Sequence, residues 1–353
     1  RPAAAAREGT VCVTGASGYV ASALINQLLA AKAPDGTPYS VVGTVRSVER
    51  WRSERLFKNV QLFEADLMNA SSFEAPFALC GALMHTASPF WFDFKPELIE
   101  TAVAGTENVL KAAKDAGITR VVVTSSSAAV TPQEPGKVEP VAGPGEAFTE
   151  ADWNRDSTRE KGPYRLSKRL AEEKVWEFAA GEGRGGHYAV VNPAFVLGPP
   201  ALPRASGESI GFMKGLLEGR LARGAPPVAL GVVDVRDVAL AHIRAMELDA
   251  ANGKRFILSS PGVFSQLELA DMLRGHRNYG SVFALPTELL GPLPPAVRYS
   301  SQRAAEVLNV TLTPVEKTVR DMADQLIFTR MVDLDAAKRR PGSPPPAPRP
   351  AEG

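Results

Sequence analysis

The segment YRLSK carries the pair of side chains best suited to chemistry, Tyr164 and Lys168. On a helix, a spacing of four residues places both side chains on one face. A phenol with a pKa of about 10 is a poor proton donor or acceptor at neutral pH, but a neighbouring ammonium stabilises the phenolate and lowers that pKa. Upstream, Ser125, Ser126 and Ser127 at the end of VVVTSSS offer hydroxyls, one of which can hold a substrate oxygen. The three groups together suit hydride transfer to a carbonyl with protonation of its oxygen.

The Tyr-x-x-x-Lys spacing is common by chance. It indicates this chemistry only where the sequence also contains a coenzyme-binding unit. The apolar residues 11–13 are followed by TGASGYVA and then by a helical pattern. Gly15 permits a tight turn, Gly18 lets the backbone approach a pyrophosphate, and Ala21 stands where a third small residue allows close helix–strand packing. The start of the helix adds N–H groups that attract phosphate. This arrangement predicts dinucleotide binding.

The strand predicted over residues 40–45 indicates which dinucleotide binds. It is followed by Arg46, with Arg50 close behind and no acid before Glu49. NAD-binding units usually have Asp or Glu here to accept from the ribose hydroxyls, whereas a planar, permanently charged guanidinium suits a 2′-phosphate. The pattern favours NADP(H), and a surface arginine at a strand end is the simpler alternative.

Short apolar segments alternate with helical stretches along the first half of the chain. The further predicted strands cover residues 60–63, 82–85, 120–124 and 188–191, and the clearest helix runs from about 96 to 114. Consecutive strands separated by helices pair in parallel through right-handed crossovers. We therefore expect a Rossmann-type, doubly wound parallel sheet whose ligands lie beyond the carboxyl ends of the strands.

Polar side chains follow several of these strand ends. We expect Asp66 to contact the adenine, and we interpret His85 as a structural residue rather than a catalyst. The candidate coenzyme-binding residues in the turn and at the strand ends are Gly15, Ser17, Gly18, Tyr19, Val20, Arg46, Asp66, Leu67, Thr86, Ala87 and Ser88.

Over residues 9–330 the chain resembles the extended short-chain dehydrogenases/reductases, especially the branch of dihydroflavonol, cinnamoyl-CoA and yeast-type carbonyl reductases. The segments that carry the resemblance are TGASGYVAS, HTASP, VAGTENVLKAA, VVVTSS, YRLSK and VVNPAFVLGP. The resemblance implies a catalytic triad of Ser126, Tyr164 and Lys168, with Asn108 as a further candidate. It also implies coenzyme contacts from Tyr164, Lys168, Pro193, Phe195 and Val196.

Departures from that branch leave the substrate open. Cinnamoyl-CoA reductases carry NWYCYGK around the tyrosine, where this chain has GPYRLSK. Dihydroflavonol reductases place Asn four or five residues after the serine, where this chain has Val130 and Thr131. Aromatic residues at 90–92, Phe148 and Trp153 can wall an apolar substrate pocket, but ordinary packing explains them equally well.

The second half has a different pattern of short helices and isolated strands. We expect residues 9–199 to form the NADP-binding domain and residues 200–330 a smaller substrate-binding lobe, with a strand at 255–259 and a closing helix at 314–328. Asp237 and His242 are interpreted as structural. Residues 1–8 and the proline-rich tail 331–353 are expected to lie outside both units.

Composition excludes several other classes of protein. The chain has 40 lysines and arginines against 39 aspartates and glutamates, which argues against a nucleic-acid partner. Its two cysteines are too few for a disulfide framework or a cysteine-based zinc site, and we expect no metal. No apolar run reaches the ~18 residues of a membrane span. We expect a cytoplasmic protein, or an organellar one if RPAAAARE is a targeting remnant; a trimmed chain explains that start as well.

Three functions are compatible with these features. The first is an NADPH-dependent reductase that acts on an aldehyde or ketone, an oxidoreductase with a small-molecule partner. The second is an NAD-dependent nucleotide-sugar epimerase/dehydratase or hydroxysteroid dehydrogenase, which Arg46 disfavours. The third is a catalytically idle subunit or scaffold of a larger assembly. A monomer, a homodimer and a subunit of a complex are all consistent with the sequence.

Overall fold

The computed structural model describes residues 9–89, 97–134, 136, 138–143, 145–203 and 205–334. The strands are β1 (Thr10–Thr14), β2 (Ser40–Val45), β3 (Val60–Glu64), β4 (Ala82–His85), β5 (Arg120–Thr124), β6 (His187–Pro193), β7 (Phe195–Leu197), β8 (Ala229–Leu230), β9 (Val232–Asp234), β10 (Lys254–Leu258) and β11 (Phe264–Ser265). The α-helices are α2 (Tyr19–Ala30), α3 (Val48–Trp51), α4 (Glu74–Phe77), α5 (Glu97–Asp115), α6 (Pro163–Ala180), α7 (Glu208–Leu217), α8 (Val235–Glu247), α9 (Gln266–Arg274), α10 (Tyr279–Val282), α11 (Gln302–Leu308) and α12 (Val315–Phe328). Short 3-10 helices are η1 (Arg55–Asn59), η2 (Ala70–Phe73), η3 (Ser127–Ala129) and η4 (Asp249–Ala251).

Seven strands form one sheet in the order β10-β6-β5-β4-β1-β2-β3. Every neighbouring pair in this sheet is parallel. From β1 the chain builds the sheet first on one side, through β2 and β3, and then on the other, through β4, β5, β6 and β10. The sheet is therefore doubly wound, and the glycine-rich turn follows β1, where the two halves meet. The prediction of a Rossmann-type parallel sheet is confirmed.

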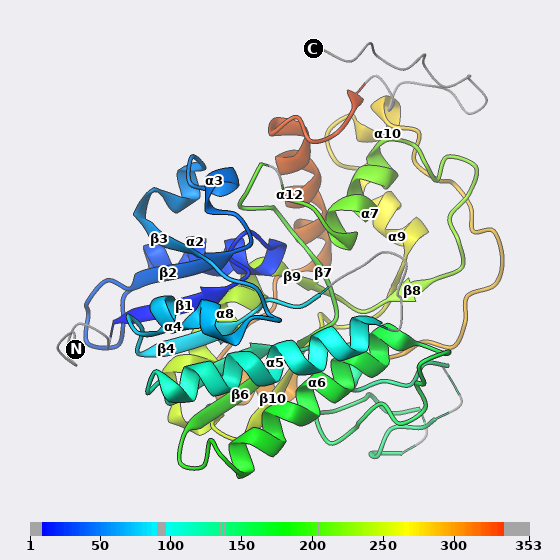
Figure 1. Cartoon of the computed structure of the whole chain (residues 1–353). Coiled ribbons are helices and arrows are strands. Elements are labelled where there is room, and N and C mark those ends of the chain that lie inside the picture. The colour runs from blue at the N-terminus through cyan, green and yellow to red at the C-terminus, as the bar shows by residue number, and fades with distance from the viewer. Residues whose placement is uncertain are drawn as a thin grey trace.

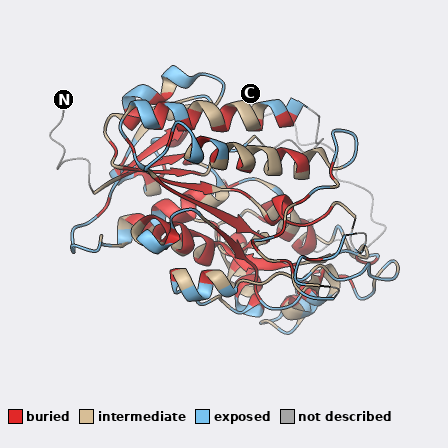
Figure 2. Ribbon diagram, turned by 90° about the horizontal axis from the view of Figure 1, so that it is seen from below, coloured by how far each residue is buried: buried red, intermediate tan, exposed pale blue. Residues whose placement is uncertain are grey.

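The strands are apolar on both faces because helices cover both. In β1, Val11 and Val13 belong to the core on the side of α2 and α8, whereas Cys12 belongs to the core under α5 and α6. Helices α5 and α6 lie side by side across their face of the sheet (Figure 1). The buried layer between sheet and helices is continuous on both sides (Figure 2). The central strands therefore lie between two helical layers.

Helix α6, which carries the catalytic candidates, begins where the sequence permits a sharp entry. Gly162 has φ 82°, a left-handed conformation that glycine adopts without strain. Pro163 follows as the first helical residue, where its fixed φ suits a helix and its missing N–H costs no bond. The entry places Tyr164 in the first turn, close to the carboxyl end of the sheet.

The smaller lobe contains α7, α9 and α12 with the two-stranded sheets β7–β9 and β8–β11. It is not the contiguous segment 200–330 that the sequence suggests, because β10 pairs with β6 in the main sheet and α8 packs on α2. A strand parallel to β6 must be reached by a crossover, and α8 supplies it.

The expected terminal segments lie mostly outside the described residues. Residues 1–8 and 335–353 are not described, and residues 331–334 continue the lobe, with Val332 buried against its core. Among the described helices, none combines the length and the apolar character needed to cross a bilayer. The described residues also contain no cluster of three or more His, Cys, Asp or Glu side chains arranged for a metal ion.

Candidate active site

The glycine-rich turn after β1 leaves no room for side chains. Gly15 has φ 66°, and a Cβ added there would lie 3.0 Å from Cα of Ala87. The N–H of Gly18 donates to the Gly15 carbonyl over 2.8 Å, and a Cβ on Gly18 would lie 3.1 Å from that oxygen. No side chain caps the start of α2. The turn therefore presents a close backbone surface and helix N–H groups, which is the geometry that binds a pyrophosphate.

Tyr19, the first residue of α2, connects the turn to the smaller lobe. Its hydroxyl donates to the Gly198 carbonyl over 2.6 Å, and burial raises the pKa of this phenol well above its usual value. Its side chain is thus used in joining two parts of the fold. Ser17 and Val20, the other candidates in the turn, are half-buried.

Arg46 directly follows β2 and is exposed. The nearby acids have other partners: Glu64 accepts from the Val48 N–H over 2.9 Å, and Glu49 pairs with Arg52. Arg50 lies over the Trp51 ring at 5.2 Å, so its guanidinium already has a neighbour. Arg46 is thus an exposed guanidinium directly after the strand, and its role at the phosphate stays a prediction.

Asp66, Leu67 and Asn108 form one local arrangement beyond β3. One carboxylate oxygen of Asp66 accepts from the Met68 N–H over 2.8 Å, and the Asn108 amide donates to the Leu67 carbonyl over 2.9 Å. The Leu67 side chain packs on Gly105 of α5, where an added Cβ would lie 2.9 Å from it. The Asn108 side chain is thus bonded to the loop expected to hold adenine, and its catalytic role stays a prediction.

The segment HTASP is anchored to Thr14 at the end of β1. The Thr14 hydroxyl accepts from the N–H groups of Thr86 and Ala87 at 3.2 and 3.1 Å, so its own proton is directed to Nδ1 of His85 at 2.8 Å. Burial, with the charge of Lys168 as a smaller contribution, lowers the pKa of His85 to about 3. The imidazole is neutral and holds the strand end, which agrees with its structural interpretation.

The structure brings Ser126, Tyr164 and Lys168 together. Ser126 follows β5 and caps η3, with its Oγ 3.1 Å from the Ala128 N–H, and its hydroxyl also hydrogen-bonds to Tyr164. Lys168 lies one turn after Tyr164, with Nζ 5.7 Å from the centre of the phenol ring, and it donates to Ser88 Oγ over 2.9 Å. The serine, the phenol and the ammonium thus surround one region at the carboxyl end of β4 and β5.

The electrostatics of this region favour a neutral Tyr164 phenol beside a Lys168 ammonium whose pKa is lowered. Burial raises the pKa of Tyr164 above its usual value, which is opposite to the lowering expected from Lys168. The Ser126 hydrogen bond and the charge of Arg165 lower this pKa in part, and Glu208 raises it. Burial lowers the pKa of Lys168 to about 8. A phenol that keeps its proton until substrate binds is suited to act as a proton donor.

Comparison with known proteins agrees with this geometry. Residues 11–258 match the NAD dependent epimerase/dehydratase family. The chain belongs to this family. Cinnamoyl-CoA reductase CAD2 of Medicago truncatula is 33% identical over 336 residues, which cover 92% of this chain and 97% of that protein. The prediction of an extended short-chain dehydrogenase/reductase is confirmed.

Solved structures of the family lead to the same result. The crystal structure of Gre2 from Candida albicans in complex with NADPH is 28% identical, with a TM-score of 0.74 over 91% of this chain and 99% of that chain. Yeast methylglyoxal/isovaleraldehyde reductase Gre2, also complexed with NADPH, is 25% identical, with a TM-score of 0.74 over 92% of this chain and 100% of the other. The expectation of an NADP(H)-dependent oxidoreductase agrees with these relatives.

The remaining candidates for coenzyme binding lie at the end of β6 and in β7. Pro193 ends β6, while Phe195 and Val196 belong to β7, and the Phe195 ring packs edge-on against Phe212 at 5.4 Å.

His242 is buried between Thr124 Oγ1 at 2.6 Å and the Val238 carbonyl at 2.8 Å, and burial lowers its pKa to about 4. Its contacts support the structural interpretation.

Asp237, likewise interpreted as structural, accepts from the N–H and hydroxyl of Thr313 at 2.6 and 2.9 Å. It thereby holds the segment that leads to the closing helix α12.

Of the aromatic residues proposed as pocket walls, Phe148 and Trp153 have packing partners, and the others lie outside the described residues. Phe148 is buried in a small apolar cluster, and the Trp153 ring lies under the guanidinium of Arg255 at 3.7 Å. Residues 90–92 lie outside the described part of the chain.

Sequence reasoning missed a buried polar group beside the triad, Glu172. It lies four residues after Lys168, so it continues the inward face of α6. An acid on the buried face of an otherwise amphipathic helix is unusual without a partner, and that position was the available signal. Its partner Arg255 is 83 residues further along the chain, where no local pattern connects the two.

Proposed function

We propose that this chain is an NADPH-dependent reductase that transfers a hydride to the carbonyl carbon of an aldehyde or ketone. The observation that carries the proposal is the contact of Tyr164 with Ser126, beside Lys168 and at the same sheet edge as the glycine-rich turn. The turn would bind the coenzyme, and the three side chains would bind and protonate the substrate oxygen beside it.

The coenzyme would be held along the carboxyl edge of the sheet. Gly15 and Gly18 provide the close backbone surface for its pyrophosphate, and a Cβ at either position would fill that surface. Arg46 would bind the 2′-phosphate, Asp66 and Leu67 the adenine, and residues 193–196 the nicotinamide. When bound, the coenzyme supplies the hydride.

The protein residues would control the proton. Ser126 and Tyr164 donate hydrogen bonds to the carbonyl oxygen, and Tyr164 passes its proton to that oxygen as negative charge develops on it. Lys168 stabilises the resulting phenolate by its positive charge. The phenolate then takes a proton from solvent, which leaves the alcohol product and a neutral tyrosine.

The test is coenzyme oxidation with a panel of aldehydes, ketones, dihydroflavonols and acyl-CoA thioesters, including methylglyoxal. We expect NADPH oxidation with at least one aldehyde or ketone, and a much slower rate with NADH. Binding of NADPH without turnover on the whole panel would reject the proposal and favour an idle scaffold. Equal use of NADH would favour the epimerase or hydroxysteroid alternative.

A further inference from the structure

A buried carboxylate lies directly behind the catalytic serine. Glu172, on α6, is 1% exposed. Its Oε2 accepts from Ser125 Oγ over 2.6 Å and from Asn192 Nδ2 over 2.7 Å. Its Oε1 accepts from Arg255 Nε over 2.5 Å. The carboxylate therefore contacts the ends of β5 and β6 and the edge strand β10.

These contacts determine where Ser126 lies. Ser125, held by its side chain, is the residue immediately before Ser126, and its N–H continues the ladder to the Val191 carbonyl at 2.8 Å. The same Asn192 amide that donates to Glu172 also donates to the Ser126 carbonyl over 3.2 Å. One carboxylate oxygen thus restrains the main chain on both sides of the catalytic serine.

Arg255 secures the carboxylate from the other side. Its guanidinium lies over Trp153, and Nη1 donates to the carbonyls of Glu150 and Asp152 at 3.1 and 2.7 Å. An apolar pair of similar volume would often stabilise a core equally well, but it would offer no acceptor to Ser125 or Asn192. The specific contribution of Glu172 is therefore the position of these two donors.

We propose that Glu172 is a positioning residue for carbonyl reduction: through Ser125 and Asn192 it holds Ser126 where its hydroxyl meets Tyr164 and the substrate oxygen. This proposal rests on the proposed function. Glu172 itself touches no reacting atom and transfers no proton. Its loss displaces the serine, while the coenzyme-binding turn and Arg46 lie outside its contacts.

The decisive experiment is a double-mutant cycle in kcat with Glu172→Gln, Ser126→Ala and the double variant. The glutamine side chain has the shape of glutamate, but an NH₂ group replaces one of the two carboxylate oxygens. The donors on that side of the side chain therefore lose their acceptor. We expect Glu172→Gln to lower kcat by about 10²-fold, with the NADPH dissociation constant within about twofold of wild type. If Glu172 acts through Ser126, the double variant is no slower than Ser126→Ala. Losses that multiply would overturn the proposal.

Glu173→Gln is the matched control, because Glu173 is the next residue of α6 and its carboxylate pairs with Arg155 and Arg169 instead of with the Glu172 network. We expect this variant to retain wild-type kcat. Equal losses from the Glu172 and Glu173 substitutions would show a general effect on α6 and overturn the proposal.

Ser125→Ala keeps the inference testable if Glu172→Gln does not fold, since it leaves the Glu172–Arg255 pair intact. Loss of one hydrogen bond should lower kcat roughly 2- to 10-fold, and the loss should vanish in the Ser126→Ala background. Wild-type kcat for Ser125→Ala would overturn the proposal. A wild-type enzyme that reduces no carbonyl, or full activity of Ser126→Ala, would reject the proposed function itself. Multiplying losses in an enzyme that needs Ser126 reject only the role of Glu172.

Discussion

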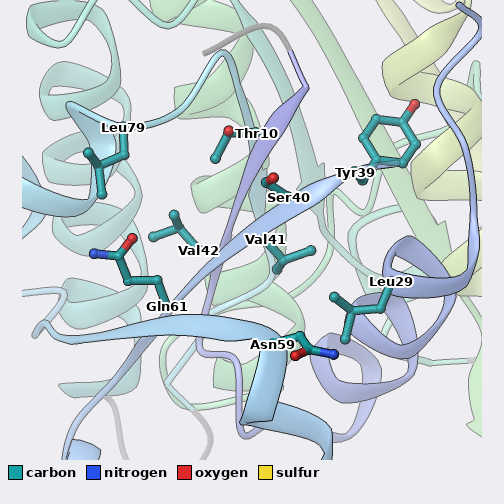
Figure 3. A pocket seen from close by; sticks show the side chains of 9 residues that line it. All are labelled: Thr10, Leu29, Tyr39, Ser40, Val41, Val42, Asn59, Gln61 and Leu79. Carbon is teal, nitrogen blue, oxygen red and sulfur yellow. The ribbon is translucent and has the colours of Figure 1, made fainter. Parts of the chain in front are cut away.

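The two ends of the seven-stranded sheet differ in chemistry. At the amino end, a cavity of about 520 Å³ lies among the starts of β1, β2 and β3 (Figure 3). None of its nine lining residues is an acid or a cation. Its one titratable side chain, Tyr39, already donates to Glu247 Oε1 over 2.9 Å. This hollow offers volume but no group that can move a proton near neutral pH.

The carboxyl end has polar side chains whose positions and protonation are set by their neighbours. Lys168 has a pKa lowered to about 8, and the raised pKa of Tyr164 keeps its phenol protonated. Both carboxylate oxygens of Glu172 accept hydrogen bonds. Perturbed groups that converge beside a helix N-terminus are typical of active sites. The comparison teaches that converging titratable groups, and not a hollow alone, mark the candidate site in this fold.

The largest expected effect tests the proton donor at the carboxyl end. Tyr164→Phe keeps the ring but removes the transferable proton, so we expect kcat to fall by about 10²- to 10⁴-fold. NADPH affinity should change little, as measured by fluorescence titration. Turnover within a few-fold of wild type on a good substrate would contradict the mechanism and erase the difference between the two ends.

The coenzyme preference tests the end of β2. A charge-assisted hydrogen bond from Arg46 is worth roughly 1.5–3 kcal/mol, or about a 10- to 150-fold preference for NADPH over NADH. Arg46→Asp should remove this preference, since the carboxylate repels the 2′-phosphate and can accept from ribose hydroxyls. Paired dissociation constants measure it. Equal binding of the two coenzymes by the wild type would show that Arg46 has no such role.

The pH dependence tests the state of Lys168. Its pKa is lowered to about 8, so the ammonium is charged below that pH and loses its charge above it. With NADPH and carbonyl, kcat/KM should fall about tenfold per pH unit above that pKa. Lys168→Arg should move this decline to higher pH, because a guanidinium stays charged. A flat profile to pH 10 in the wild type would contradict the assignment.

The smallest effect is expected at the amino end. Gln61 lines the cavity and is exposed. Gln61→Thr retains a strand-compatible residue, so we expect kcat within twofold of wild type and a free energy of unfolding within about 0.5 kcal/mol. A large loss of turnover would show that the two ends are coupled and that the cavity participates in function.

The positions of the main candidate groups were predictable because their spacing and surroundings are local. The order of strand, glycine-rich turn and helix predicted the place of Gly15 and Gly18, and the four-residue interval predicted that Tyr164 and Lys168 share a helix face. Arg46 was predictable as the residue directly after a strand. Its role at the phosphate stays a prediction, as does that of Asn108.

Only the tertiary structure decided which distant residues meet. Glu172 and Arg255 are joined across 83 residues, and the Trp153 ring covers that guanidinium. The return of β10 to the main sheet brings Arg255 there and makes the smaller lobe discontinuous. By itself the sequence determined the period of each element and the chemistry of each strand end, since both depend on neighbouring residues. The partners of buried charges depend on how helices and strands pack, and that packing is a property of the whole chain.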